Sequence, residues 1–291
     1  MSNQFRLGSR SLFKREGEGT LTPKRVVFLS VEGTNTEVDY FKYVEKNREQ
    51  LRISSIVHVE VLNKIDTNSD LESIFELLEE YIRIRNNGEF KQELLEINLQ
   101  KYKPNFIRTY LDDPTKLTEK ERRKFESVRR SANMDLHYFH FLNNYRGIDD
   151  KFGVVIDRDS KSHSLDQMNQ IFMKCKERGY LCFISNPCFE FWLLLHVSDV
   201  KKEYDEHLDE IRNNDVDAQR NSYVSNLLFS KTNHRKRITK KSFERHYLPN
   251  IDKAIKRAKD FSEGLSLPCE LIDRVGSNLW ELFDVLREKN L

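Results

Sequence analysis

The chain has 291 residues, of which 38% are apolar and 33% are charged, and its formal net charge is +2. This is the composition of a globular, helix-rich protein that can bury a substantial core, and it excludes a disordered or fibrous chain. A net charge so close to zero does not itself indicate nucleic-acid binding, so such a role must rest on local clusters of charge.

Cysteine spacing and hydropathy further restrict the class of protein to which the chain can belong. The four cysteines show neither a C-x-x-C spacing nor the cysteine–histidine spacing of a zinc finger, so we expect reduced, mostly buried thiols. No apolar run is long enough to span a membrane, and the first residues lack the apolar segment of a signal peptide. We therefore expect a cytoplasmic protein that does not bind membranes.

The first part of the chain alternates between predicted strands and helices. Residues 1–23 are polar and basic, and we expect them to form a flexible arm. The elements expected after the arm are a strand over 25–31, a helix over 34–47, a strand over 56–62 and an amphipathic helix that opens near residue 69. This order predicts a parallel sheet.

Residues 88–148 interrupt the alternation with a segment rich in Lys, Arg, Glu, Asn and aromatic residues, which we interpret as a helical insertion. Its helical stretches are expected near 89–101, 117–131 and 133–145. The alternation then resumes with a strand over 152–156, a helix over 164–178 closed by Gly179, a strand over 180–184, and a helix from Pro187 to about His196.

The expected fold class is therefore α/β. A parallel sheet of about four strands, flanked by helices, would occupy residues 24–198, which include the insertion. Residues 199–291 are expected to form a helical C-terminal region packed on this domain, with a last helix near 277–289.

Acidic residues follow two of the predicted strands. Glu32 comes directly after the first strand, and Asp157 and Asp159 follow the third. Residues i and i+2 of an extended chain point to the same side, and open parallel sheets bind ligands at the carboxyl ends of their strands. If these strands are parallel neighbours, three carboxylates converge, which favours bound Mg²⁺ or Mn²⁺. The simpler alternative is that Asp157 and Asp159 are turn and N-cap residues.

Three motifs resemble those of the RloB family. They are Val31-Glu32-Gly33-x-x-Thr36-Glu37, then Asp157-x-Asp159, then Ser185-Asn186-Pro187-x-Phe189-Glu190-x-Trp192-Leu193-Leu194-x-His196. The resemblance covers about residues 24–290, and the third motif is the most specific. The resemblance implies a Toprim-like (topoisomerase–primase) fold. In that fold, a Glu after the first strand and an Asp-x-Asp after the third strand hold Mg²⁺ for phosphodiester chemistry. The resemblance also implies phage defence by abortive infection, together with an AAA-type ATPase.

Residue by residue, the resemblance implies that Asp157 and Asp159 are metal ligands and that Glu32 is a metal ligand or a general acid/base. Glu190, in the first turn of its helix, is a fourth catalytic candidate, although an acid there can simply stabilise the helix dipole. Glu37 has the same two interpretations. His196, at a helix end, is more typical of a structural histidine.

The densest run of basic residues spans 231–246. Clusters of this kind contact nucleic-acid phosphates, although they can also form a solvated face. The candidate contacts are Lys236, Arg237, Lys240 and Lys241. Either of the last two could also reach the active site and stabilise developing negative charge there.

Together these features predict a Mg²⁺-dependent nuclease that cleaves DNA or a structured RNA such as tRNA, acts with an ATPase partner, and is compatible with a homo-oligomer. The alternative is a non-catalytic Toprim-like module that docks on the ATPase. A phosphotransferase of the haloacid-dehalogenase type ranks third, because that class carries its Asp-x-Asp on the first strand. The chain has no G-x-x-x-x-G-K-[ST], so ATP hydrolysis would belong to a partner.

Overall fold

The computed structural model describes residues 25–33, 35–53, 57–62, 71, 74–76, 78–79, 82, 106, 109, 116–131, 150–159, 163–235, 237–263 and 268–287. By its internal contacts the chain divides into two compact units, Met1–Thr22 with Glu79–Ile148 and Pro23–Leu78 with Asp149–Leu291. The predicted arm and the predicted helical stretches at 89–101 and 133–145 lie outside the described residues.

The larger unit contains a five-stranded sheet in the order β2-β1-β3-β4-β5. Its strands are β1 (Arg25–Val31), β2 (Val57–Leu62), β3 (Lys151–Asp157), β4 (Leu181–Asn186) and β5 (Gly276–Ser277). The first four are parallel, which confirms the α/β prediction, and β5 is antiparallel to β4. A two-residue strand is too short to show alternation, so the sequence does not signal β5.

The winding of the sheet reverses at β1, which pairs with β2 on one side and with β3 on the other. The register sets Val31 beside Val155 and Asp157 beside Ser185. The carboxyl ends of β1 and β3 therefore meet at the topological switch point, where open α/β sheets bind their ligands.

Helices follow the strands and make up the C-terminal region. Those of the larger unit with defined bounds are α2 (Thr36–Lys46), α8 (Leu165–Arg178), α9 (Phe189–Val197), α10 (Val200–Glu203), α11 (Leu208–Asn213), α12 (Tyr223–Thr232), α13 (Lys240–Ser242), α14 (Ile251–Phe261) and α15 (Leu279–Arg287). Ser164 forms a capping box at the start of α8, and Gly179 closes it with φ 71°, as the sequence predicts. Within the described residues, no helix has the length and apolar character needed to cross a membrane.

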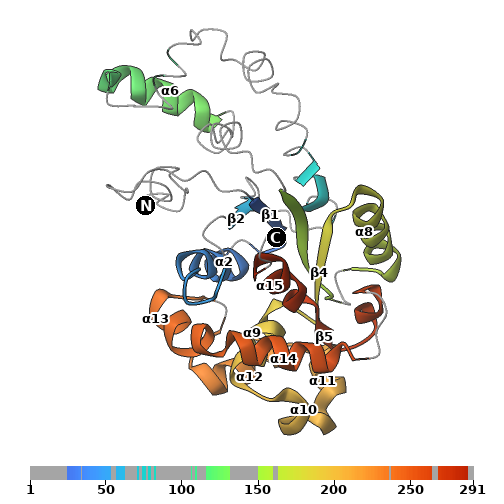
Figure 1. Cartoon of the computed structure of the whole chain (residues 1–291). Helices are drawn as coiled ribbons and strands as arrows, with labels where there is room; N and C mark the ends of the chain where they lie inside the picture. Colours follow the sequence, from blue (N-terminus) through green and yellow to red (C-terminus); the bar gives the residue numbers. More distant parts are fainter. Residues whose placement is uncertain are drawn as a thin grey trace. The chain divides into compact units, whose positions relative to one another are not determined.

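Strands β1, β3 and β4 are buried on both faces over most of their length. Val27, Leu29 and Val31 belong to one core cluster with residues of α2, α9, α14 and α15. On the opposite face, the Ser30 hydroxyl donates a hydrogen bond of 2.8 Å to the backbone carbonyl of Ile74. Figure 1 shows α8 on one side of the strands and α2 and α15 on the other. Parallel sheets require this layering because neither face can remain in water.

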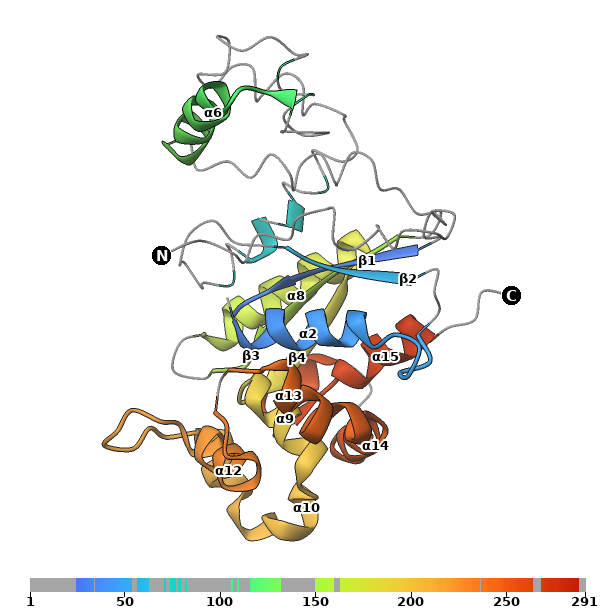
Figure 2. The same cartoon turned by 90° about the vertical axis from the view of Figure 1, so that its left-hand side faces the viewer.

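Helix α9 is the central helix of the C-terminal region. Its sequence, FEFWLLLHV, is almost entirely apolar, and every residue from Phe189 to His196 is buried. It packs against α12, α14 and β4 (Figure 2). A helix that is apolar on all sides is a core helix, so α9 positions its charged residue, Glu190, by the packing of everything around it.

The segment before α9 departs from the sequence prediction. Ser185 and Asn186 belong to β4, and the N-cap of α9 is Cys188, so Pro187 precedes the helix instead of starting it. The Ser185 hydroxyl lies 2.9 Å from that of Ser277, and the Asn186 amide donates to the backbone carbonyl of Leu271 at 2.8 Å. The strand is longer than predicted because residues about 90 positions later in the chain pair with its end.

The smaller unit contains α6 (Glu119–Ser131), which the sequence predicts over 117–131. Thr118 and Glu121 form a reciprocal capping box at its start: the Glu121 backbone N–H donates to the Thr118 hydroxyl, and the Thr118 N–H donates to the Glu121 carboxylate. Phe125 is buried and meets the ring of Phe106 edge-on, with centroids 5.3 Å apart.

A buried hydrogen-bond chain joins α2 to α9. The Tyr40 hydroxyl lies 3.1 Å from Nε2 of His196, whose Nδ1 lies 2.9 Å from the backbone carbonyl of Trp192. Burial lowers the pKa of His196 to about 3, so the imidazole is neutral, donates from Nδ1 and accepts from Tyr40. Rings of Phe189, Phe243 and other aromatic residues surround the pair. His196 is therefore a structural residue of the core.

Replacing Tyr40 with Phe should lower the free energy of unfolding by about 1–3 kcal/mol, because Nε2 of His196 would lose its donor without regaining water. Urea unfolding measures the change. Tyr223→Phe, at a half-exposed tyrosine, is the matched control and should have a much smaller effect. Equal effects of the two substitutions would show that the buried bond contributes nothing.

Candidate active site

Four carboxylates gather at the switch point, and we call Glu32, Glu37, Asp157 and Glu190 the acidic group. Burial, followed by the charges of Glu37, Glu32 and Glu190, raises the pKa of Asp157 well above its ordinary value. Burial, followed by the charges of Glu190 and Glu32, raises the pKa of Glu37 to about 7. The side chains therefore act on one another electrostatically, although they come from three segments that are far apart in the sequence.

Glu32 is held at the end of β1 by contacts to the loop region after β3. One carboxylate oxygen, Oε2, accepts the backbone N–H of Asp157 at 3.1 Å, and the other, Oε1, lies 3.2 Å from Nε2 of His163. The backbone N–H of Glu32 also donates to the carbonyl of Val155 at 3.2 Å, which continues the strand pairing by one residue. Glu32 therefore connects the ends of β1 and β3.

Glu37 lies in the first turn of α2 and folds back over the end of β1. Its Oε1 accepts the backbone N–H of Gly33 at 3.1 Å. A Cβ atom on Gly33 would collide with the Glu37 carboxylate, so only glycine permits this close approach. This contact gives a physical reason for the spacing Glu-Gly-x-x-Thr-Glu in the sequence.

Asp157 and Glu190 meet at the start of α9. The side chain of the N-cap residue, Cys188, makes no capping hydrogen bond. The backbone N–H of Phe189 instead interacts with Asp157 and opposes the rise in its pKa. Glu190 follows in the first turn and is buried. Since α2 and α9 both begin at this edge, their partial positive charges offset part of the repulsion within the acidic group.

Asp159 lies in the loop between β3 and α8. It is half-buried, and its backbone carbonyl accepts the N–H of His163 at 2.9 Å. Strand β3 ends at Asp157, so the strand alternation that predicts a common side for the two aspartates does not continue to Asp159. Its placement with the other carboxylates therefore stays a prediction, and Glu37 joins them instead.

Two residues that the sequence interpretation missed hold this loop. Arg158 is buried and donates from Nε to the carbonyl of Ile272 and from Nη1 to the carbonyl of His163, both at 3.0 Å. His163 in turn contacts Glu32. The only sequence signals are a basic residue between two aspartates and a single histidine in a polar stretch, and neither indicates a partner.

The acidic group suits a divalent metal ion in its chemistry, because Mg²⁺ and Mn²⁺ prefer carboxylate oxygens. Burial and, after it, the charges of neighbouring carboxylates raise the pKa values of Asp157 and Glu37, and a bound cation would relieve the repulsion among these charges. In the part of the chain that the structure describes, however, no three His, Cys, Asp or Glu side chains are already arranged to hold a metal ion. The donor type fits, and the metal itself stays a prediction.

Of the predicted phosphate contacts, Lys236 lies outside the described residues, and Arg237, Lys240 and Lys241 are exposed. The Lys240 ammonium lies 3.7 Å from the Glu244 carboxylate. The structure therefore presents these cations to solvent, as a binding surface requires.

This basic segment lies beside α2, the helix whose first turn contains Glu37. The backbone of Lys240 interacts with the Tyr43 hydroxyl, and the ring centroids of Tyr43 and Phe243 are 5.4 Å apart. Burial raises the pKa of Asp39, and the charges of Lys42 and Arg237 oppose that rise. The first turn of α2 therefore contributes to the acidic group, while its next turns contact the basic segment.

Replacing Glu37 with Gln should change how stability depends on pH in chelator-treated protein. Because the folded-state pKa of Glu37 is raised from 4.5 to about 7, the folded chain binds more protons than the unfolded chain between these values, and stability falls as pH rises through them. The substitution should flatten that fall and stabilise the protein by up to about 3 kcal/mol at pH 8.

Urea unfolding at several pH values with EDTA present measures this change. Glu177→Gln, at an exposed position of α8, is the control and should leave the pH profile as in the wild type. A Glu37→Gln profile that coincides with the wild-type profile would contradict the raised pKa of Glu37 in the folded protein.

Comparison with known proteins identifies the family of the chain. A model of the RloB-like protein family matches residues 27–284. A comparison with curated proteins finds no match, and neither does a comparison with solved structures. Because the family match extends over nearly the whole chain, including all four members of the acidic group, the chain belongs to the RloB-like family.

Proposed function

We propose that this protein is a metal-dependent nuclease of Toprim type that hydrolyses phosphodiester bonds of DNA or structured RNA such as tRNA. The observation that carries the proposal is the acidic group itself, at the switch point of the sheet. The proposal includes antiviral defence by abortive infection, with an ATPase partner, as the resemblance of the motifs to the RloB family implies.

The energetics of the acidic group favour a functional role. Buried charges without a compensating partner cost stability, and apolar residues of similar volume are commonly neutral or stabilising in their place. Strongly perturbed carboxylates in one place are typical of sites that bind or transform a ligand. The fold gains nothing evident from the repulsion among Glu32, Glu37 and Asp157, whereas a nuclease that binds a cation requires such carboxylates.

In the proposed site, Glu32, Asp157 and Asp159 would hold Mg²⁺ or Mn²⁺. Such an ion, when bound, polarises a phosphoryl oxygen and lowers the pKa of water. The contributions of the chain are distinct: His163 and Arg158 orient Glu32 and the loop after β3, and Glu190 would take or hold a proton at its carboxylate. The starts of α2 and α9 would favour a phosphate beside them.

The basic segment would bind phosphates of the nucleic acid other than the one that reacts. Arg237, Lys240 and Lys241 are exposed, and the segment that carries them contacts the helix whose first turn contributes Glu37. Cations placed in this way bind backbone phosphates without reading the base sequence.

Asp157→Asn should abolish phage protection and lower nuclease activity at least about 100-fold, because it removes a carboxylate needed at the reacting phosphate. The variant should remain folded, since it also removes buried repulsion. Plaque counts in cells that express the chain and its ATPase partner provide one measurement, and cleavage of plasmid DNA and bulk tRNA with Mg²⁺ provides another. Glu177→Gln is the matched control. Full protection by Asp157→Asn would refute catalysis.

Calorimetric titration of Mg²⁺ and Mn²⁺ should detect binding to the wild-type protein and none to the Asp157→Asn/Asp159→Asn variant. The reason is that oxygen ligands bind these ions and amides replace the carboxylates in the variant. Binding that persists unchanged in the double variant would place the ion elsewhere.

A second candidate function is a non-catalytic module that docks on an ATPase. The observation in its favour is that the described residues contain no preassembled set of three metal ligands. The Asp157→Asn variant separates the two functions, because a docking module would keep both its partner and phage protection.

A further inference from the structure

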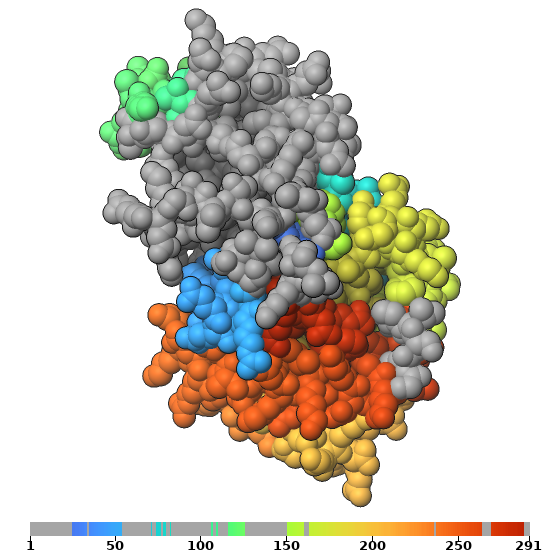
Figure 3. Space-filling model, in the orientation of Figure 1, coloured from blue at the N-terminus to red at the C-terminus, as the bar shows by residue number. Residues whose placement is uncertain are grey.

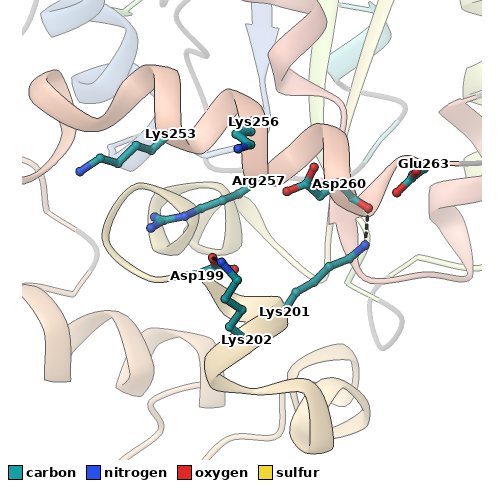
Figure 4. Close-up of a pocket in the computed structure, with 8 residues that line it drawn as sticks. All are labelled: Asp199, Lys201, Lys202, Lys253, Lys256, Arg257, Asp260 and Glu263. Carbon is teal, nitrogen blue, oxygen red and sulfur yellow. Dashed lines mark hydrogen bonds and ion pairs between the residues drawn. The ribbon is translucent and has the colours of Figure 1, made fainter.

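A charged cleft lies between α14 and the segment that contains α10. Its volume is about 400 Å³, and five basic and three acidic residues line it (Figure 4). It includes Asp199, just beyond the end of α9, whereas Glu190 lies in the first turn of that helix. The nine residues of α9 extend roughly 14 Å along the helix axis. The cleft and the acidic group therefore lie at opposite ends of α9 and are distinct sites. Helix α14, which forms one side of the cleft, also adjoins α15 at the surface (Figure 3).

The basic residues of α14 give the cleft a cationic end. Lys253 and Lys256 are exposed, and Lys253 donates to the side-chain oxygen of Asn250 at 3.0 Å. Among the described residues, none forms a hydrogen bond or an ion pair with the Lys256 ammonium. An ammonium group without an internal partner can bind a ligand without breaking a bond in the protein.

At the cationic end of the cleft, the side chain of Arg257 is held in place by a hydrogen bond. Its Nη1 donates to the backbone carbonyl of Leu195 in α9 at 2.6 Å, which anchors a half-buried guanidinium. Figure 4 shows its side chain extending from α14 toward the segment that carries Asp199. A guanidinium has five N–H donors in one plane, so donors remain for an oxyanion. A side chain that is already ordered loses little entropy when a ligand binds.

The other end of the cleft is acidic. Asp260 and Glu263 lie there together with Lys201, whose ammonium donates to the backbone carbonyl of Asp260 and lies 5.2 Å from the ring centroid of Phe261 (Figure 4). Each strand of a DNA duplex carries one phosphate per about 3.4 Å of helix axis, so a nucleic acid that follows the cleft would place phosphates against these carboxylates. A small molecule with one phosphate end avoids that repulsion.

We propose that this cleft binds a small phosphorylated molecule of the mononucleotide class. Its phosphate would contact Lys253, Lys256 and Arg257, and its hydroxyl or amino groups would donate to Asp260 and Glu263. The volume lies within the range of about 300–1,000 Å³ that is usual for small-molecule sites. The assignment is independent of the nuclease proposal, because it concerns different residues and is tested by binding alone.

The test is calorimetric titration of the full chain with AMP, with pyrophosphate and with a single-stranded oligonucleotide. AMP should bind to the wild type, and Lys256→Glu should weaken that binding at least tenfold. Lys176→Glu makes the same charge change on the exposed surface of α8 and should leave it unchanged. Glu263→Ala should weaken AMP binding but not pyrophosphate binding, because only AMP has groups that donate to the carboxylate.

Three results would overturn the proposal. The first is no binding of AMP or pyrophosphate at millimolar concentration. The second is equal binding of AMP to the wild type and to Lys256→Glu, with the circular dichroism of both unchanged. The third is binding of the oligonucleotide alone with sensitivity to Lys256→Glu, which would make the cleft a nucleic-acid contact instead.

Discussion

The parallel pairing of β1 with β3 is the constraint on which the rest of the structure depends. It sets Glu32 against the backbone N–H of Asp157 and so fixes two carboxylates at one edge of the sheet, against their mutual repulsion. The protein offsets part of this repulsion with backbone donors, among them the N–H of Phe189, and with the starts of two helices. The edge is thereby left receptive to positive charge.

The C-terminal region is part of the architecture of that edge. Carbonyl groups of Leu271 and Ile272 hold Asn186 and Arg158, and Ser277 pairs with Ser185, so residues near the end of the chain fix the ends of β3 and β4. The same region surrounds α9, which brings Glu190 to the acidic group. A change in this packing would therefore act on the site without touching any carboxylate.

The acidic group and the basic segment lie on different elements of the larger unit. Carboxylates occupy the switch point, whereas exposed cations lie on the segment before and within α13 and on α14. Helices α2 and α9 connect these regions: α2 contributes Glu37 and contacts the backbone of Lys240, and α9 contributes Glu190 while Arg257 binds its last turn. A net charge of +2 conceals this separation, because the two signs nearly cancel in the total.

The sequence by itself determined the parallel strands, the caps of α8 and the acidic residues at the strand ends, because each depends on neighbouring residues and on periodicity. Only the tertiary structure decided which side chains meet. His163 and Arg158 entered the site, and Ser185 and Asn186 were bound to the C-terminal region, through contacts to residues up to 131 positions away. Such contacts leave no local pattern, because chain folding, and not spacing along the sequence, brings their partners together.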